Sequence, residues 1–212
     1  MRHPIILVIA TRNKGKTKEI KALLNDFPVK IKNLDDFGPI PHLEEDGDTF
    51  DENAYKKASF AARILGLPAL ADDSGLIVEA LGNAPGIHSA RYAGENATDE
   101  ERYLKLLHEM KGKTNRKAAF ECVISVAVPS GAALTYEARC EGIIAEEPAG
   151  SNGFGYDPVF FYPPFHKTFA QISRSEKNRI SHRGKALAEL KSEFDKVLVW
   201  IRQHMPVPEK HH

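Results

Sequence analysis

The N-terminal part of the chain changes abruptly from one periodicity to another. Residues 5–10 form an uninterrupted apolar run rich in β-branched side chains, which predicts a buried strand. A polar turn at 11–15 follows directly, and from about Lys16 the apolar residues recur at helical spacing until Pro28 ends the helix. A buried strand that leads into a helix through a short turn is typical of an α/β protein.

The rest of the chain continues this alternation and then adds a hairpin. Further strands are predicted at 29–31, 69–71, 76–81, 117–128, 133–146 and 159–162, and further helices at 50–65, at 99–110 and from 182 onward. The turn-forming residues 72–75 are expected to break the strand that they interrupt. This order predicts an α/β fold with a mixed β-sheet platform and flanking helices.

The domain organisation follows from the absence of a flexible linker. We expect a single domain at 1–205, with two lobes around a central nucleotide-binding cleft, and a disordered tail at 206–212. The two cysteines, Cys122 and Cys140, lack CxxC spacing. They are predicted to be buried free thiols, or a disulfide only if their strands pair in register.

The charge balance gives no support for a strongly charged partner. Lys and Arg together number 29, and so do Asp and Glu, which gives no argument for a nucleic-acid polymer or a membrane surface. No segment approaches the roughly 20 apolar residues that span a bilayer, and the N-terminal run lacks the length of a signal peptide. The sequence therefore predicts a cytoplasmic protein without a membrane partner.

The turn at 11–16 is the first candidate site. A strand that leads into a helix N-terminus offers free backbone N–H groups and the positive end of the helix dipole, and both favour phosphate. Asn13 would add an amide and Lys16 a point charge. Residues 15–17 match the end of a P-loop, but the glycine required five residues earlier is Ala10. A capped helix with surface lysines explains the turn equally well.

Adjacent carboxylates, Asp72 and Asp73, form the second candidate site. They repel each other unless a cation or hydrogen-bond donors compensate. In an extended strand they point to opposite sides, so one would face a ligand and the other would be structural. A turn capped by Asp and Ser74 is the alternative. The acidic loop with Glu44 and Glu45 could supply a second oxygen ligand, and such hard oxygens favour Mg²⁺ over Zn²⁺.

Two later segments could recognise a nucleotide base. In residues 151–158, glycines flank Phe154, so the backbone can approach a ligand closely while the ring stacks on a base. A tight turn with a buried Phe154 is the alternative. Ser181 is a good N-cap for the last helix, but the helix dipole disfavours the cations of His182 and Arg183 unless an acceptor lies nearby.

These motifs occur in an order that gives the chain a family resemblance. They are Thr-x-Asn-x-x-Lys at 11–16, Asp-Asp-Ser-Gly-Leu at 72–76, Pro-Gly-Ile-His-Ser-Ala-Arg-Tyr at 85–92, Gly-Phe-Gly-Tyr-Asp-Pro at 153–158 and Ser-His-Arg at 181–183. From about Ile5 to Leu190 the chain closely resembles the inosine triphosphate pyrophosphatase family. The resemblance implies a two-lobed mixed α/β fold, a homodimer, and Mg²⁺-dependent hydrolysis of dITP, ITP or XTP to the monophosphate and pyrophosphate.

The resemblance also implies a role for individual residues. Asp73 would be the general base and a metal ligand, and Glu45 the second metal ligand. The implied phosphate-binding residues are Thr11, Arg12, Asn13, Lys14, Gly15, Lys16 and Lys57, and Ser74 is an implied substrate contact adjacent to Asp73. The implied purine-binding residues are Phe154, Gly155, Tyr156 and Asp157, with Lys177, His182 and Arg183 for recognition of the purine. Asn152 departs from the family pattern, in which many relatives have glycine.

These roles together define a mechanism, and two other functions compete with it. Asp73 would deprotonate a water that attacks the α-phosphorus, and donors near His182 would bond O6 of the base and mismatch adenine. Nothing in the sequence explains how GTP is rejected. One rival is a P-loop-like kinase or NTPase, against which Ala10 argues. The other is a nucleotide-binding module without catalysis, in which the acidic cluster is a solvated face.

Overall fold

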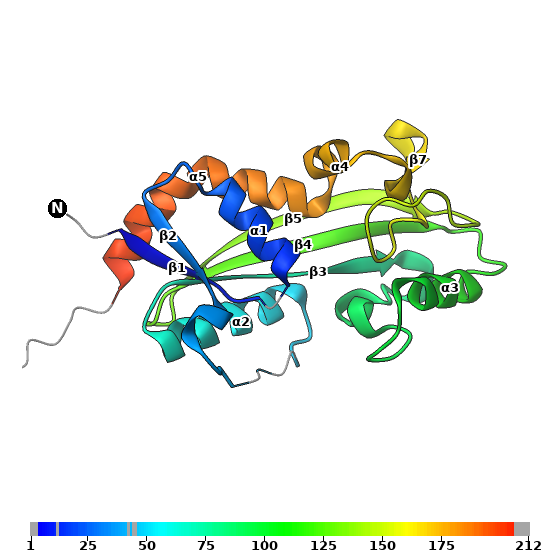
Figure 1. The fold of residues 1–212 in the computed structure, drawn as a ribbon. Coiled ribbons are helices and arrows are strands. Elements are labelled where there is room, and N and C mark those ends of the chain that lie inside the picture. Colours follow the sequence, from blue (N-terminus) through cyan, green and yellow to red (C-terminus); the bar gives the residue numbers. More distant parts are fainter. Residues whose placement is uncertain (1–3, 12, 42, 44–45, 206–212) are drawn as a thin grey trace, which may run out of the picture. The chain divides into compact units, whose positions relative to one another are not determined.

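The computed structural model describes residues 4–11, 13–41, 43 and 46–205 and contains a mixed sheet flanked by helices (Figure 1). The strands are β1 (Ile5–Ile9), β2 (Val29–Asn33), β3 (Ala69–Val78), β4 (Lys117–Ala127), β5 (Ala133–Ile144), β6 (Phe160–Tyr162) and β7 (Lys167–Thr168). The α-helices are α1 (Lys14–Leu23), α2 (Phe50–Leu65), α3 (Asp99–Glu109), α4 (Arg174–Ile180) and α5 (His182–His204). The short 3₁₀ helices are η1 (Leu34–Phe37), η2 (Glu79–Leu81), η3 (Gly86–Arg91), η4 (Pro163–Phe165) and η5 (Phe169–Gln171).

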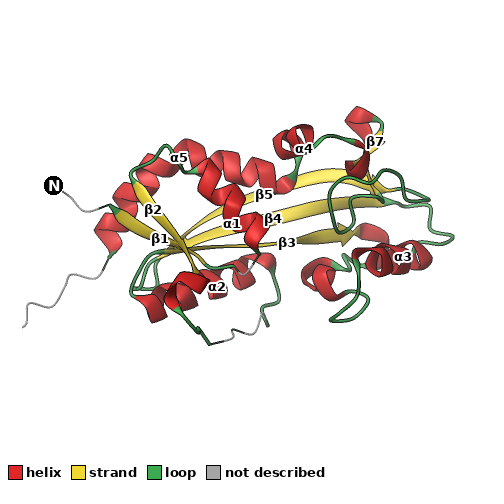
Figure 2. Cartoon of the chain, viewed as in Figure 1, coloured by secondary structure: helices red, strands yellow, loops and turns green. Residues whose placement is uncertain are grey.

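The sheet has the strand order β2-β1-β3-β4-β5-β6-β7. Strand β1 runs parallel to both of its neighbours, β2 and β3, whereas β6 pairs antiparallel with β5 and with β7. A tight turn at 128–132 joins β4 to β5, as expected for a hairpin. The predicted α/β fold with a mixed sheet and flanking helices is therefore confirmed (Figure 2).

Strand β3 and helix α1 depart most clearly from the predictions. Strand β3 runs without interruption from Ala69 to Val78, so the predicted break at 72–75 is wrong. The two aspartates of this segment have lysine partners, which lets the backbone stay extended through residues that favour turns. Helix α1 begins at Lys14 rather than at about Lys16, because the side chain of Asn13 caps it.

Contacts divide the chain into two compact units. Unit 1 consists of residues 1–73, 123–136 and 186–212, and unit 2 consists of residues 74–122 and 137–185. Strands β3, β4 and β5 and helix α5 each contribute residues to both units. The single domain at 1–205 and the cleft between its lobes stay predictions.

In unit 1, helix α2 packs on the sheet through small side chains. The buried cluster there consists of Val8, Ala10, Ala58, Ala61, Ala62, Ala69, Ala71 and Ala127. Thr49 caps α2, and Gly66 ends it in the left-handed conformation, as the sequence predicts. Helices α1 and α5 lie on the other side of the strands (Figure 1), where the rings of Phe27 and Phe194 meet with centroids 4.8 Å apart.

In unit 2, Leu106 of α3 and Met110, the C-cap residue of that helix, belong to the core. Their partners include Leu76, Val78, Phe120, Cys140, Ile144, Phe160, Phe169 and Ile172. Cys122 and Cys140 are buried thiols that form no disulfide, as predicted, and burial raises the pKa of Cys140 to about 11. Within the described part of the chain, none of the helices has the length and apolar character that crossing a membrane requires.

Candidate functional site

The turn after β1 is organised by Asn13. Its side-chain oxygen accepts hydrogen bonds from the backbone N–H groups of Gly15 (2.9 Å) and Lys16 (3.1 Å), and its own N–H donates to Thr11 Oγ1 (3.2 Å). The expectation that these N–H groups are free is therefore wrong, because Asn13 acts as their cap. Arg12 and the side chain of Lys14 lie outside the described residues.

Each aspartate of β3 forms an ion pair with a lysine from a different helix. Lys16 of α1 lies 2.6 Å from Asp72, and Lys57 of α2 lies 2.9 Å from Asp73. Helices α1 and α2 cover opposite faces of the strands in unit 1 (Figure 1), so the adjacent carboxylates point to opposite sides, as an extended strand requires. The Asp72 side chain is 2% exposed and that of Asp73 is 14% exposed. Asp72 is therefore the more enclosed carboxylate and Asp73 the more accessible one.

Among the residues that the structure describes, the aspartates of β3 are the candidate ligands for a metal ion. Glu44 and Glu45 lie outside the described residues, and within the described ones no three His, Cys, Asp or Glu side chains gather as a ligand set. Mg²⁺ typically binds through one or two protein carboxylates together with substrate phosphates and waters. The hard carboxylate oxygens of Asp73 fit that requirement, whereas Asp72 points to the other side of the strand. Ser74 follows in the same strand and is half-buried.

In unit 2, the loop that carries Phe154 presents this ring to solvent. The side chain is 71% exposed, so the alternative of a buried Phe154 is wrong. Gly153 and Gly155 both have positive φ angles, +81° and +64°, which side chains rarely allow. The Lys177 Nζ atom lies 4.7 Å from the Phe154 ring centroid, within the range of a cation–π contact.

The carboxylate of Asp157 closes this loop from the inside. It is buried, forms an ion pair with Lys177, and accepts a hydrogen bond from the Phe154 backbone N–H at 2.9 Å. Burial raises the pKa of Asp157, and the positive charge of Lys177 opposes this change. A Cβ atom at Gly153 would lie 1.9 Å from Asp157 Oδ2, so glycine is required there.

The neighbouring Tyr156 is buried and connects the loop to the core. Its hydroxyl donates to the backbone oxygen of Ser89 at 2.9 Å. The hydroxyl of Ser89 in turn accepts from the Leu76 N–H of β3 at 2.9 Å. Ser89, within the segment 85–92 of the family resemblance, thus links the loop to β3.

The start of α5 adds a second aromatic contact. The His182 ring stacks on Phe120 with centroids 4.7 Å apart and an interplanar angle of 13°. Phe120 also stacks with Phe169. Lys177 Nζ lies 5.6 Å from the ring centroid of Phe169. Sequence reasoning missed both phenylalanines, because an aromatic residue in a strand or short helix has no spacing that distinguishes a site from a core. Arg183 is half-buried beside His182.

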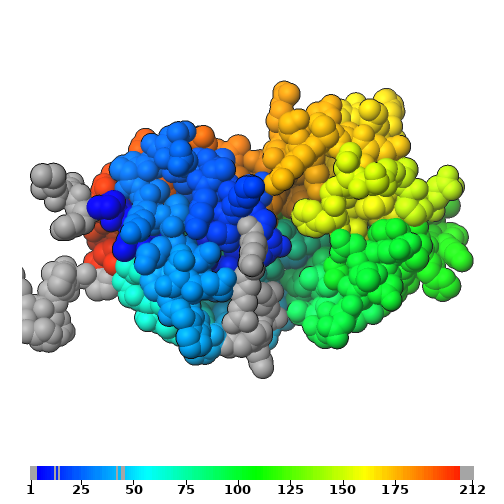
Figure 3. Space-filling model, in the orientation of Figure 1, coloured from blue at the N-terminus to red at the C-terminus, as the bar shows by residue number. Residues whose placement is uncertain are grey.

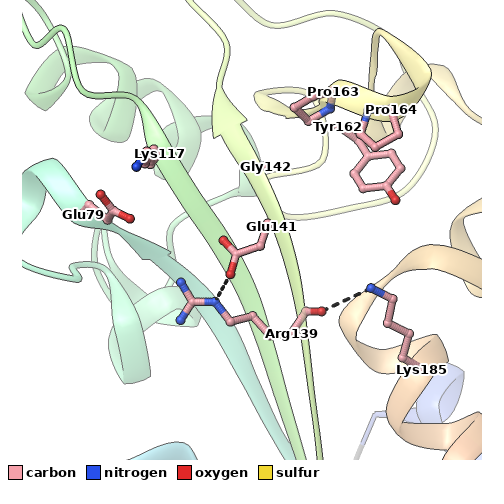
Figure 4. Close-up of a pocket in the computed structure, with 9 residues that line it drawn as sticks. All are labelled: Glu79, Lys117, Arg139, Glu141, Gly142, Tyr162, Pro163, Pro164 and Lys185. Carbon is pink, nitrogen blue, oxygen red and sulfur yellow. Dashed lines mark hydrogen bonds and ion pairs between the residues drawn. The ribbon is translucent and has the colours of Figure 1, made fainter.

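Among the hollows on the surface of unit 2, two are compared as candidate sites. The larger, about 520 Å³, is lined by Glu79, Lys117, Arg139, Glu141, Gly142, Tyr162, Pro163, Pro164 and Lys185, none of which is a predicted site residue (Figure 4). Several of its charged ends bond within the hollow, with Arg139 Nε 2.5 Å from Glu141 Oε1 and Lys185 Nζ 3.3 Å from the Arg139 backbone oxygen. Because these contacts occupy its charges, the larger hollow is a weak candidate for the site.

The smaller hollow, about 220 Å³, adjoins the exposed aromatic ring. It is lined by Asp99, Glu100, Tyr103, Ser151, Asn152, Gly153, Phe154, Gly155 and Pro158. In Figure 3 the yellow-green loop lies against the green surface of α3. The candidate base-binding loop and the first turn of α3 are therefore neighbours.

Comparison with known proteins gives a family match over most of the chain. The model of the Ham1 family matches residues 7–193. The dITP/XTP pyrophosphatase of Syntrophobacter fumaroxidans is 63% identical over 201 residues, which cover 95% of this chain and 86% of that protein. The dITP/XTP pyrophosphatase of Desulfotalea psychrophila is 56% identical over 200 residues, covering 94% and 90%.

Solved structures agree with the sequence matches. The HAM1 protein from Coxiella burnetii has a TM-score of 0.88 and 45% identity, covering 91% of this chain and 99% of that one. The nucleoside-triphosphatase, or dITP/XTP pyrophosphatase, from Mycobacterium abscessus has a TM-score of 0.78 and 37% identity, covering 88% and 98%.

Proposed function

The chain belongs to the Ham1 family, and from this premise we propose that it hydrolyses dITP, ITP and XTP to the nucleoside monophosphate and pyrophosphate. Such an activity removes damaged purine nucleotides from the precursor pool. The observation that carries the proposal is the pair of lysine contacts on adjacent carboxylates of β3, Lys16 with Asp72 and Lys57 with Asp73. These pairs combine anionic groups for a metal and a water with cationic groups for phosphate.

The proposed chemistry begins at Asp73. Its carboxylate orients one water molecule and takes a proton from it as the oxygen attacks the α-phosphorus. Lys57, 2.9 Å from this carboxylate, and Lys16 supply fixed positive charge toward the phosphates. Asp72, enclosed and paired with Lys16, supports the strand instead of the reaction. The bond between the α-phosphorus and its bridging oxygen breaks, and pyrophosphate leaves.

We assign Mg²⁺ as the metal on the chemistry of the donors. Asp73 would hold it together with Glu45, and the substrate phosphates would complete its ligands. When bound, Mg²⁺ neutralises phosphate charge and stabilises the pyrophosphate leaving group.

The purine is assigned to the groups of unit 2. The exposed ring of Phe154 offers a face for stacking, which typically contributes about 1–3 kcal/mol per base. Lys177, His182 and Arg183 can donate hydrogen bonds, which suit the acceptor O6 of hypoxanthine and xanthine. Adenine carries a donor amine at this position and would leave those donors unpaired. A homodimer and a cytoplasmic location remain predictions.

A product panel tests the proposal. The protein is incubated with Mg²⁺ and, separately, ITP, dITP, XTP, GTP, ATP and dUTP, and pyrophosphate and orthophosphate are measured. We expect pyrophosphate from ITP, dITP and XTP at rates well above those for ATP. Orthophosphate alone would indicate an NTPase instead. Tight binding of ITP without turnover would indicate a binding module.

A further inference from the structure

The backbone on either side of the Phe154 ring is held by two carboxylates from different parts of unit 2. The N–H group of Phe154 donates to Asp157 within the loop, at 2.9 Å. The next N–H group, that of Gly155, donates to Asp99 Oδ2 at 2.6 Å. Asp99 is the first residue of α3 and lies 56 positions earlier in the chain. A charged acceptor gives one of the stronger classes of hydrogen bond to a backbone N–H.

The carboxylate of Asp99 is itself fixed in orientation. Its second oxygen accepts from Arg102 Nη1 at 2.7 Å, and Arg102 Nη2 donates to the Ala97 backbone oxygen at 2.5 Å. One oxygen therefore faces the helix and the other faces the loop. The Asp99 side chain is 44% exposed, so it can be replaced without emptying a packed core.

Capping of α3 does not account for this contact. The N-cap is Thr98, whose hydroxyl accepts from the Glu101 N–H while the Glu101 carboxylate accepts from the Thr98 N–H. This reciprocal pair satisfies the start of the helix without Asp99. Glu100, the next residue, supplies the same favourable negative charge at the helix N-terminus. What distinguishes Asp99 from Glu100 is its hydrogen bond to the loop.

We propose that Asp99 is a positioning residue for base binding, which acts by fixing the Gly155 N–H group and thereby the direction of the Phe154 ring. The inference rests on the proposed function, because it assumes that the purine stacks on Phe154. A loop with two glycines at positive φ has many alternative conformations, and a bond to a rigid helix removes some of them before the ligand arrives. Asp99 touches neither base nor phosphate in this account.

The test compares Asp99→Ala with Glu100→Ala, a matched control that removes the same charge from the same helix turn. Amide hydrogen exchange is measured by NMR in the nucleotide-free proteins. We expect the Gly155 N–H to exchange at least about tenfold faster in Asp99→Ala and to be unchanged in Glu100→Ala. This measurement does not depend on turnover.

Kinetics with ITP then shows whether the contact serves the substrate. We expect Asp99→Ala to raise KM about tenfold, equivalent to about 1.4 kcal/mol, with kcat within about threefold of the unaltered protein. Glu137→Ala removes an exposed carboxylate of β5 that lines neither hollow, and as the kinetic control it should leave both values unchanged. Unchanged Gly155 exchange in Asp99→Ala, or faster exchange with the KM of the control, would overturn the inference. An unaltered protein that releases no pyrophosphate from ITP contradicts the proposed function itself, and the inference falls with it.

Discussion

Phe154 and Asp99 show how much the sequence reveals about the surroundings of a single residue. The sequence singles out Phe154 between two glycines but leaves open whether the ring is buried, and the structure exposes it. Asp99 escapes prediction altogether, because an acidic residue in the first turn of a helix is also what simple dipole stabilisation requires. The contact with Gly155 depends on a loop 56 positions away, which no local pattern encodes.

Removing the exposed ring tests its role directly. Phe154→Ala should raise KM for ITP by roughly 5- to 150-fold, since a stacking contact contributes about 1–3 kcal/mol. Its free energy of unfolding should stay within about 0.5 kcal/mol of the unaltered protein, because the ring buries little surface. Phe165→Ala removes another exposed aromatic ring and serves as the control for KM. Equal KM values for the two variants would remove Phe154 from the site.

At the scale of elements, the sequence predicts helices better than interrupted strands. Helix α2 follows its predicted course because Thr49 and Gly66 mark its ends with local chemistry. The predicted break in strand β3 is wrong because residues 72–75 favour turns only locally. Ion pairs of Asp72 and Asp73 with lysines of α1 and α2 outweigh that preference. Those pairings are tertiary, so the pattern of residues 69–78 alone cannot reveal them.

The two carboxylates of β3 should separate stability from turnover. Asp73→Asn is expected to lower kcat by at least about 100-fold, as loss of a general base does, and to leave ITP binding measurable. Asp72→Asn is expected to cost about 1–3 kcal/mol of unfolding free energy, because it alters the enclosed partner of Lys16, and to retain measurable turnover. Urea unfolding and steady-state kinetics on both variants check this division. Full activity in Asp73→Asn would reject our choice of base.

At the corner between α4 and α5, a glycine-to-alanine substitution is expected to destabilise the protein instead of stabilising it. Gly→Ala in an exposed helix interior ordinarily stabilises by about 1 kcal/mol. A Cβ atom at Gly184 would instead lie 1.7 Å from the Asn178 backbone oxygen, so Gly184→Ala should destabilise by roughly 1–3 kcal/mol in urea unfolding. Ala188→Gly on the exposed face of α5 measures the propensity of the same helix, and about 1 kcal/mol of destabilisation is expected. A stabilised Gly184→Ala variant would show that the corner is not closely packed.

At the scale of the whole molecule, the alternation of strands and helices predicts the fold class. The mixed sheet follows from the hairpin of β4 and β5 and from the short antiparallel strands after it. The strand order, with β1 between β2 and β3, depends on long-range pairing and was not predicted. The family match over residues 7–193 carries the choice of substrate, whereas local residue chemistry carries the phosphate and metal assignments. The residues assigned to phosphate belong to unit 1 and those assigned to the purine belong to unit 2. Ser74, which follows the proposed base Asp73, also belongs to unit 2.

The central claim is that water attacks the α-phosphorus of a purine triphosphate with Asp73 as base. Hydrolysis of ITP in ¹⁸O-labelled water, followed by mass spectrometry of both products, tests it most directly. We predict one ¹⁸O atom in IMP and none in pyrophosphate, with the labelled product lost in Asp73→Asn. Label in pyrophosphate instead of IMP, or in orthophosphate, would place the attack on a different phosphorus and contradict the account.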